Sequence, residues 1–330
     1  MAGPSVSTGR SQEGAACPIT PNGTGAQAVE SPIMVLKHAL EHRRRKALSP
    51  YNSNAWASEL KCHRLLGKYP SIVHRLANSF DLGIPQIHCT FTPPNHQSLR
   101  SLHNVYSTIT QNEFNAGCYI GPFTRQQVEA ELGPFQSSPL SLVPKTSKPG
   151  KFRAVHNFSH PHDPLHNATS INSHIDSNEY SCTWGTFSTV SLLIAHLPPG
   201  SQASVRDVVE AYRTIPVIPA QWPGLVIHLQ GEDQYAINVC NDFGLTSAGG
   251  IYGMLADAGA DIFCSNSIGP LSKWVDNHIF FRIPRLSLSD YNAKRAVWCS
   301  EIQADGGRRQ DAQPHMVWGK GTAEWLAGGV

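Results

Sequence analysis

Two aspartates stand out because each lies beside a run of small or apolar residues. Asp207 closes one predicted strand, and Asp276 lies in the tetrapeptide Trp274-Val275-Asp276-Asn277, just before the apolar run 278–281. An unpaired buried carboxylate is very costly, and a single aspartate of this kind can simply cap a turn. Two of them at the ends of strands in one sheet instead predict a shared cation. Mg²⁺ suits such a site, since it prefers one or two carboxylates together with substrate phosphates.

The elements that would position these aspartates alternate between strands and helices. Short β-rich runs bounded by turn residues predict strands, and Gly231-Glu232-Asp233 predicts a hairpin turn. The order predicts an α+β protein in which an antiparallel sheet is backed by helices. The expected strands cover 138–145, 151–159, 203–212 (leading into a helix), 225–230, 234–240 and 273–283, and the expected helices cover 184–197 and 246–264.

The chain before residue 116 divides into a tail and a basic helical region. Residues 1–33 contain sixteen Gly, Pro, Ser or Thr, which predicts disorder. Within 34–115, apolar residues at helical spacing predict helices over 35–48 and 54–80, with a break at Pro70. From 37 to 75 there are nine Lys or Arg against two Glu, so this region presents either solvated helix faces or a surface that binds phosphates.

Composition narrows the class of protein. The net charge of +2 does not by itself indicate a nucleic-acid binder. The eight cysteines are far apart and form no Cys-x-x-Cys pair, which argues against a zinc ribbon and for reduced thiols inside the cell. No stretch approaches the roughly 20 apolar residues of a membrane span. We therefore expect a soluble intracellular protein without a membrane partner, in either the nucleus or the cytoplasm; the oligomeric state stays open.

Four motifs follow one another along the chain: SPLSLVPKTSKPGKFRAVHNFS (138–159), DVVEAYRTIPV (207–217), FGLTSAGG (243–250) and WVDN (274–277). In this order they resemble the motif series of a retroelement reverse transcriptase, with a likeness to the polymerase of fungal tyrosine-recombinase (DIRS-type) retrotransposons. The resemblance implies a right-hand polymerase with fingers at 116–190 and a palm at 191–300.

The resemblance implies RNA-directed DNA synthesis on an RNA or DNA template-primer with deoxynucleoside triphosphates. Asp207 and Asp276 would be the palm carboxylates that hold two Mg²⁺ (or Mn²⁺) ions. One ion would activate the primer 3′-hydroxyl and the other would stabilise the leaving pyrophosphate. Arg153 matches the fingertip arginine that contacts the triphosphate, with Lys151 (or Lys148 or Lys145) assisting, because a guanidinium binds phosphate bidentately.

Two further positions are assigned by the same resemblance. Tyr212 matches the aromatic gate that packs against the deoxyribose and excludes a 2′-hydroxyl. Phe243 and Gly244 match the loop that contacts the base pair and template, where glycine permits close backbone approach.

The chain also departs from the family pattern. The third palm motif normally ends in two aspartates, but the second is Asn277, which carries no charge. Asn241-Asp242 and Gly249 stand where the family has Leu-Pro and Pro, so Asp242 is expected to add negative charge near the template path. Little chain follows WVDN, which implies little or no thumb and a truncated extension at 301–330. We therefore expect an impaired polymerase.

Three other interpretations are open. The chain could be a non-catalytic, nucleic-acid-binding relic of a reverse transcriptase. It could be a hydrolase that uses Ser247, although no Gly-x-Ser-x-Gly elbow is present. Imidazoles at high density could also bind zinc; the candidate ligands are His156, His160, His162, Asp163, His166 and His174.

Overall fold

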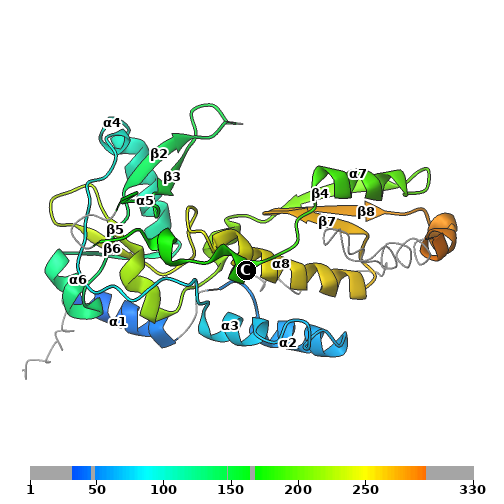
Figure 1. The fold of residues 1–330 in the computed structure, drawn as a ribbon, viewed down its shortest axis with the longest axis horizontal. Coiled ribbons are helices and arrows are strands. Elements are labelled where there is room, and N and C mark those ends of the chain that lie inside the picture. Colours follow the sequence, from blue (N-terminus) through cyan, green and yellow to red (C-terminus); the bar gives the residue numbers. More distant parts are fainter. Residues whose placement is uncertain (1–31, 46–48, 147, 164–167, 295–330) are drawn as a thin grey trace, which may run out of the picture.

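The computed structural model describes residues 32–45, 49–146, 148–163 and 168–294. Helices and three small antiparallel sheets alternate along the chain, which confirms the expected α+β class. The molecule is elongated, with the sheet that carries the two aspartates at one end (Figure 1). Nearly all of the expected tail at 1–33, and all of the expected extension at 301–330, lie outside the described residues.

The first three helices lie where the apolar spacing predicts them, over 35–48 and 54–80, whereas the next three were not predicted. Pro70, where a break is expected, lies in the turn between the second and third helices. Inside a helix, a proline would leave one backbone hydrogen bond unmade because it has no N–H. Asn52 begins the second helix, since its side-chain oxygen accepts hydrogen bonds from the N–H groups of Asn54 and Ala55, both 3.1 Å away. The helices are α1 (Pro32–Arg45), α2 (Ser53–Cys62), α3 (Ile72–Asn78), α4 (Ser98–Ser101), α5 (His103–Asn115) and α6 (Arg125–Leu132).

Five strands form a three-stranded sheet and a separate hairpin. The sheet has the order β1 (Tyr119–Phe123), β6 (Tyr235–Asn238), β5 (Val226–His228), and the hairpin pairs β2 (Leu140–Pro144) with β3 (Phe152–His156). The expected strands at 138–145, 151–159, 225–230 and 234–240 are thus confirmed in shortened form. Strand β1 was not predicted, because Pro122 lacks the N–H that a strand interior uses.

The third sheet has the order β4 (Gln202–Asp207), β8 (Asn277–Arg282), β7 (Leu271–Trp274), and it is flanked by α7 (Phe187–Ala195) and α8 (Ala248–Ser265) (Figure 1). The prediction of one strand over 273–283 is wrong, because the chain reverses at Val275 and Asp276. Val275 takes the left-handed conformation, with φ of 52°, which a β-branched residue rarely adopts.

Short 3₁₀ helices connect these elements. The helix expected after Asp207 is one such turn, η3, rather than a longer α-helix. The 3₁₀ helices are η1 (Ile171–His174), η2 (Ser177–Tyr180), η3 (Ala211–Thr214), η4 (Pro219–Leu225) and η5 (Arg285–Ser287).

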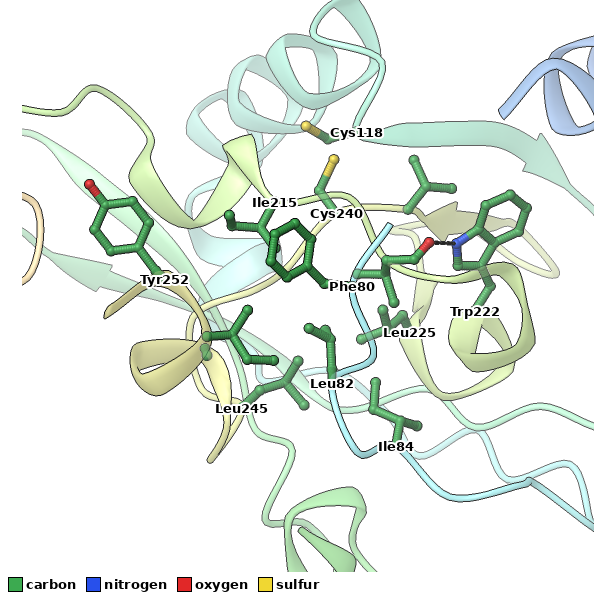
Figure 2. Close-up of a cluster of buried hydrophobic side chains, with 14 of the residues drawn as sticks. Phe80, Leu82, Ile84, Cys118, Ile215, Trp222, Leu225, Cys240, Leu245 and Tyr252 are labelled. Carbon is green, nitrogen blue, oxygen red and sulfur yellow. Dashed lines mark hydrogen bonds between the residues drawn. The ribbon is translucent and has the colours of Figure 1, made fainter. Parts of the chain in front are cut away.

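A continuous hydrophobic core joins the N-terminal helices to α8 and to the β1-β6-β5 sheet. The extended segment 80–84 passes through it, and Phe80 and Leu82 are fully buried there (Figure 2). Trp222 is buried beside this segment and donates its indole N–H to the Val217 carbonyl at 2.9 Å. The regions on either side of residue 116 therefore share one core, which fixes where η3 and α8 lie.

Among the described residues, no helix combines the length and apolar character needed to cross a membrane.

Candidate functional site

The register of the third sheet brings the predicted catalytic residues together. Asp207 pairs with Asn277 across β4 and β8, and Trp274 pairs with the same Asn277 across β7 and β8. The backbone N–H of Val208 donates to the carbonyl of Asp276 at 2.8 Å. Two aspartates that lie far apart in sequence therefore meet at one end of one sheet.

The three side chains at this end differ in their environment. Asp207 is exposed, whereas Asp276 and Asn277 are half-buried. Asn277 donates its amide Nδ2–H to Oδ1 of Asp276 at 2.9 Å. The asparagine adds no charge, and it uses one acceptor position of the neighbouring carboxylate.

Two tyrosines lie within electrostatic range of the aspartates. Burial raises the pKa of Tyr212, and the charge of Asp276 raises it further. Burial likewise raises the pKa of Tyr252, with smaller contributions from Tyr51, Asp276, Tyr212 and Asp207. Both phenols therefore stay protonated near neutral pH, and the tyrosines and carboxylates form one cluster.

Tyr212 packs against Phe243, so two of the predicted nucleotide-binding residues are in contact. Their ring centroids lie 4.5 Å apart, and the Tyr212 ring lies 5.8 Å from that of Tyr252. A methyl group at Gly249 would lie 3.5 Å from the Tyr212 hydroxyl. Phe243 remains 38% exposed, so this aromatic surface is accessible beside the aspartates.

Gly244 is a glycine for a reason that the sequence did not reveal. Its φ of 101° is one that residues with a side chain rarely adopt, and a Cβ atom there would overlap the backbone carbonyl oxygen of His156. Its own carbonyl accepts a hydrogen bond from Asn172 Nδ2 at 2.8 Å. The close approach seen here is thus to strand β3.

Arg153 and Lys151 lie on the β2–β3 hairpin, in a different sheet from the aspartates. Arg153 is exposed on β3 opposite Val143, and no hydrogen bond or ion pair joins its side chain to another described residue. Lys151 is also exposed, and its N–H donates to the Lys148 carbonyl at 3.1 Å within the hairpin loop. The structure brings neither into contact with Asp207 or Asp276 among the residues it describes.

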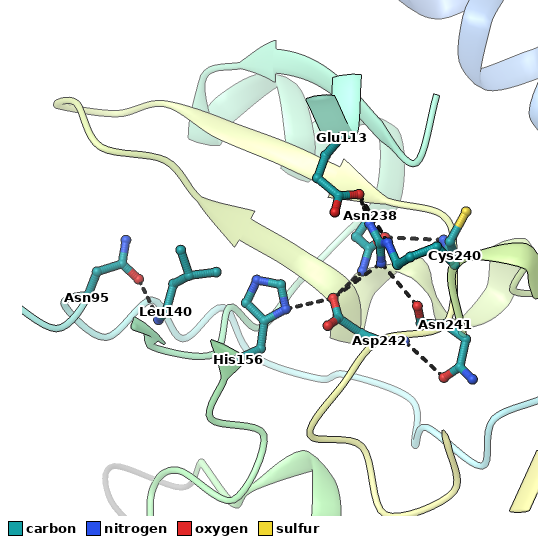
Figure 3. A network of polar contacts seen from close by, with 9 residues as sticks. Asn95, Glu113, Leu140, His156, Asn238, Cys240, Asn241 and Asp242 are labelled. Atoms are coloured by element: carbon teal, nitrogen blue, oxygen red, sulfur yellow. Dashed lines mark hydrogen bonds and ion pairs between the residues drawn. The ribbon is translucent and has the colours of Figure 1, made fainter. Parts of the chain in front are cut away.

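The expectation that Asp242 adds charge near the template path is wrong. Asp242 is 5% exposed, and its Oδ2 accepts hydrogen bonds from Asn238 Nδ2 at 2.8 Å and from His156 Nδ1 at 2.6 Å (Figure 3). Arg213 lies 3.4 Å from the same oxygen and also binds Glu113 through Nε and Nη2, at 3.0 and 2.5 Å. The charge of Asp242 is therefore paired inside the protein.

The zinc and hydrolase interpretations find no support. His156 bonds to Asp242, His174 Nε2 lies 2.6 Å from the Thr169 hydroxyl, and His166 lies outside the described residues. Within the described part of the chain, no three His, Cys, Asp or Glu side chains lie together as metal ligands do. Ser247 is fully buried and donates its hydroxyl to the Leu82 carbonyl at 2.7 Å, so it offers no accessible nucleophile.

Some of the positive charges of the basic segment 37–75 form ion pairs within the protein. Lys37 pairs with Glu131 at 3.1 Å, and Lys68 pairs with Asp261 at 2.6 Å. Lys61 and Arg64 are exposed and remain candidates for phosphate contact.

Comparison with known proteins gives weak likenesses. No family model matches the chain, and no curated protein matches it. Among solved structures it is similar to the native protease-reverse transcriptase of prototype foamy virus, with a TM-score of 0.42 and 13% identity over 87% of this chain and 33% of that one. It is also similar to the foamy viral enzyme in complex with an RNA/DNA hybrid (TM-score 0.40, 15% identity, 88% and 33% covered).

A third similar structure is the foamy viral enzyme dRH in complex with double-stranded DNA, with a TM-score of 0.38 and 15% identity over 88% of this chain and 43% of that one. The chain thus spans less than half the length of these structures.

Proposed function

We propose that the chain is an RNA-directed DNA polymerase of retroelement origin that acts by two-metal nucleotidyl transfer, with its rate reduced by Asn277. The observation that carries the proposal is the strand register that sets Asp207 beside Asp276 and Asn277. The four motifs in chain order support it, since they supply a fingertip arginine, an aromatic gate and a glycine loop as well. In this proposal, residues 116–190 form fingers and residues 191–300 form the palm.

The residues at the end of the sheet fit Mg²⁺ or Mn²⁺. Asp207 and Asp276 provide two carboxylates, and Asn277 can add a neutral carbonyl oxygen, which matches the preference of Mg²⁺ for few protein ligands plus substrate phosphates. Bound ions would lower the pKa of the primer 3′-hydroxyl and neutralise charge on the triphosphate.

The protein's own side chains would place the substrate. Arg153, exposed and without a partner among the described residues, is free to bind triphosphate oxygens with its planar fork. Tyr212 and Phe243 form an aromatic wall beside the aspartates, against which a deoxyribose can pack.

The proposed gate predicts that Tyr212→Val admits ribonucleotides. Exclusion of a 2′-hydroxyl by a ring is steric, so removing the ring should lower the preference for dNTP over NTP by about tenfold or more. Primer extension with matched dNTP and NTP measures this ratio. Tyr106→Phe, in a separate core cluster, is the control. An unchanged ratio for Tyr212→Val would remove Tyr212 from the gate.

Primer extension on an RNA template with Mg²⁺ or Mn²⁺ tests the proposal directly, and Asn277→Asp sharpens the test. This substitution restores a carboxylate and removes the amide that donates to Asp276, so we expect incorporation to rise about tenfold or more. Asn178→Asp adds the same charge at an exposed position and should have no effect. Extension that is equally fast with Asn277 and with aspartate would contradict the proposed impairment.

A binding-only relic is the second candidate, and the hydrogen bond from Asn277 to Asp276 favours it. That bond takes up a carboxylate oxygen that a metal ion would otherwise use. In that case the exposed cations of segment 37–75 would still bind nucleic acid, with an affinity that falls as salt rises. Salt-dependent binding without incorporation, in both the natural chain and Asn277→Asp, would select this candidate.

A further inference from the structure

A largely buried charged network joins segments of the chain that carry the proposed nucleotide-binding residues. It consists of Glu113 on α5, His156 on β3, Arg213 on η3, Asn238 on β6 and Asp242, and we call it the Arg213 network (Figure 3). We propose that the Arg213 network is a positioning device that holds the nucleotide-binding side chains in register and thereby sets the affinity for the incoming nucleotide. This inference rests on the proposed function.

Three members of the network are close in sequence to a proposed nucleotide-binding residue. Arg213 directly follows Tyr212, and Asp242 directly precedes Phe243. His156 lies on the same five-residue strand as Arg153, three positions along. The hydrogen bond between His156 and Asp242 therefore links the strand of the fingertip arginine to the loop of the aromatic wall.

Three of the network's side chains are buried, and each makes a directed polar contact within the network. The side chains of Arg213, Asp242 and His156 are 8%, 7% and 3% exposed. Burial alone would lower the pKa of Arg213, but Asp242 and Glu113 raise it well above its ordinary value, so the guanidinium stays charged. Because a carboxylate accepts only, His156 Nδ1 must be the donor to Asp242, which fixes the orientation of the ring.

A second contact joins the same two segments. Gly244 lies against the His156 carbonyl oxygen, so closely that no side chain fits between them. Strand β3 and residues 242–244 are thus held both by a charged hydrogen bond and by backbone packing. A change in the charged bond should shift Phe243 and Arg153 relative to each other without unfolding the site.

The test is nucleotide binding by Asp242→Asn, which keeps the hydrogen-bonding shape and removes the charge that faces Arg213. The protein is loaded with a template-primer whose 3′ end is a dideoxynucleotide, so that the matched dNTP binds without reacting. We expect the Kd for dNTP to rise about tenfold, as is typical of coupling inside a buried network, while the affinity for template-primer stays within about twofold.

Asp261→Asn is the matched control, because Asp261 is equally buried, pairs with Lys68 and accepts from Tyr69 at 2.5 Å, and has no predicted nucleotide-binding neighbour in the sequence. It should lower the thermal unfolding midpoint without changing the Kd for dNTP. Equal weakening by both variants would mean general loosening and would overturn the inference.

His156→Gln tests the hydrogen bond between His156 and Asp242 from its other end. If Asp242→Asn fails to fold, this variant still tests whether the network sets the affinity for dNTP. The double variant should weaken dNTP binding by less than the product of the two single effects, since both variants weaken the hydrogen bond between His156 and Asp242. If the natural chain binds template-primer and dNTP but neither variant changes the Kd for dNTP, the inference fails alone. If the natural chain binds neither ligand, the proposed function fails with it.

Discussion

Replacing Asp207 with asparagine should reduce nucleotide incorporation by about a hundred- to a thousandfold. The site holds two carboxylates where the reverse transcriptase pattern that the chain resembles has three, so losing Asp207 removes half of the negative charge that would bind the metal ions. The loss should appear in kcat more than in the affinity for template-primer, because a metal ligand acts mainly where charge develops in the transition state.

The measurement is single-nucleotide extension, carried out in the natural chain and also in the Asn277→Asp background, where Asp207 is one of three carboxylates and a large decrease can be followed. Asp207 is exposed at the end of β4, so the thermal unfolding midpoint should not change. Asp290→Asn is the control, since it removes a carboxylate that pairs with Lys294 on the surface at 2.9 Å. Incorporation that survives Asp207→Asn would mean that the convergence of the two aspartates has no catalytic role.

The convergence of the two aspartates could be expected from the sequence because each follows or interrupts a strand-like run. What could not be expected was the way the chain turns at Asp276. No glycine or Asn-Gly pair marks a hairpin between Trp274 and Asn277, and a left-handed valine contradicts local preference. The turn forms because β7 and β8 pair with each other and β8 with β4, so tertiary contacts override the preference of Val275.

The Arg213 network was beyond prediction for a different reason. Its members come from segments as far apart as residues 113 and 242, and nothing in the local pattern pairs them. From the sequence, Asp242 is expected to be a surface charge beside a loop, because no local pattern indicates that a guanidinium and an imidazole face it. The spacing of apolar residues predicts most of the strands and helices. The partners of the buried charges are set by how those elements pack, which the spacing does not indicate.

Replacing Gly244 with alanine should destabilise the protein by about 3 kcal/mol, from two separate causes. The φ of 101° is strained for any residue with a side chain, and the new methyl group would overlap the carbonyl oxygen of His156. That carbonyl cannot retreat easily, because His156 pairs with Leu140 in the β2–β3 hairpin. Denaturant unfolding measures the change in the free energy of unfolding.

Two other glycines separate the two causes. Gly133 has a φ of 77° and open space where a Cβ would lie. Gly133→Ala should therefore introduce backbone strain alone and lower the free energy of unfolding by about 1 kcal/mol. Gly67 has neither strain nor a neighbour within 4 Å, so Gly67→Ala should be neutral or slightly stabilising. If Gly244→Ala costs no more than Gly133→Ala, residues 242–244 can move away from β3. The backbone contact would then not hold Phe243 in place, and any coupling between Arg153 and Phe243 would depend on the hydrogen bond between His156 and Asp242 alone.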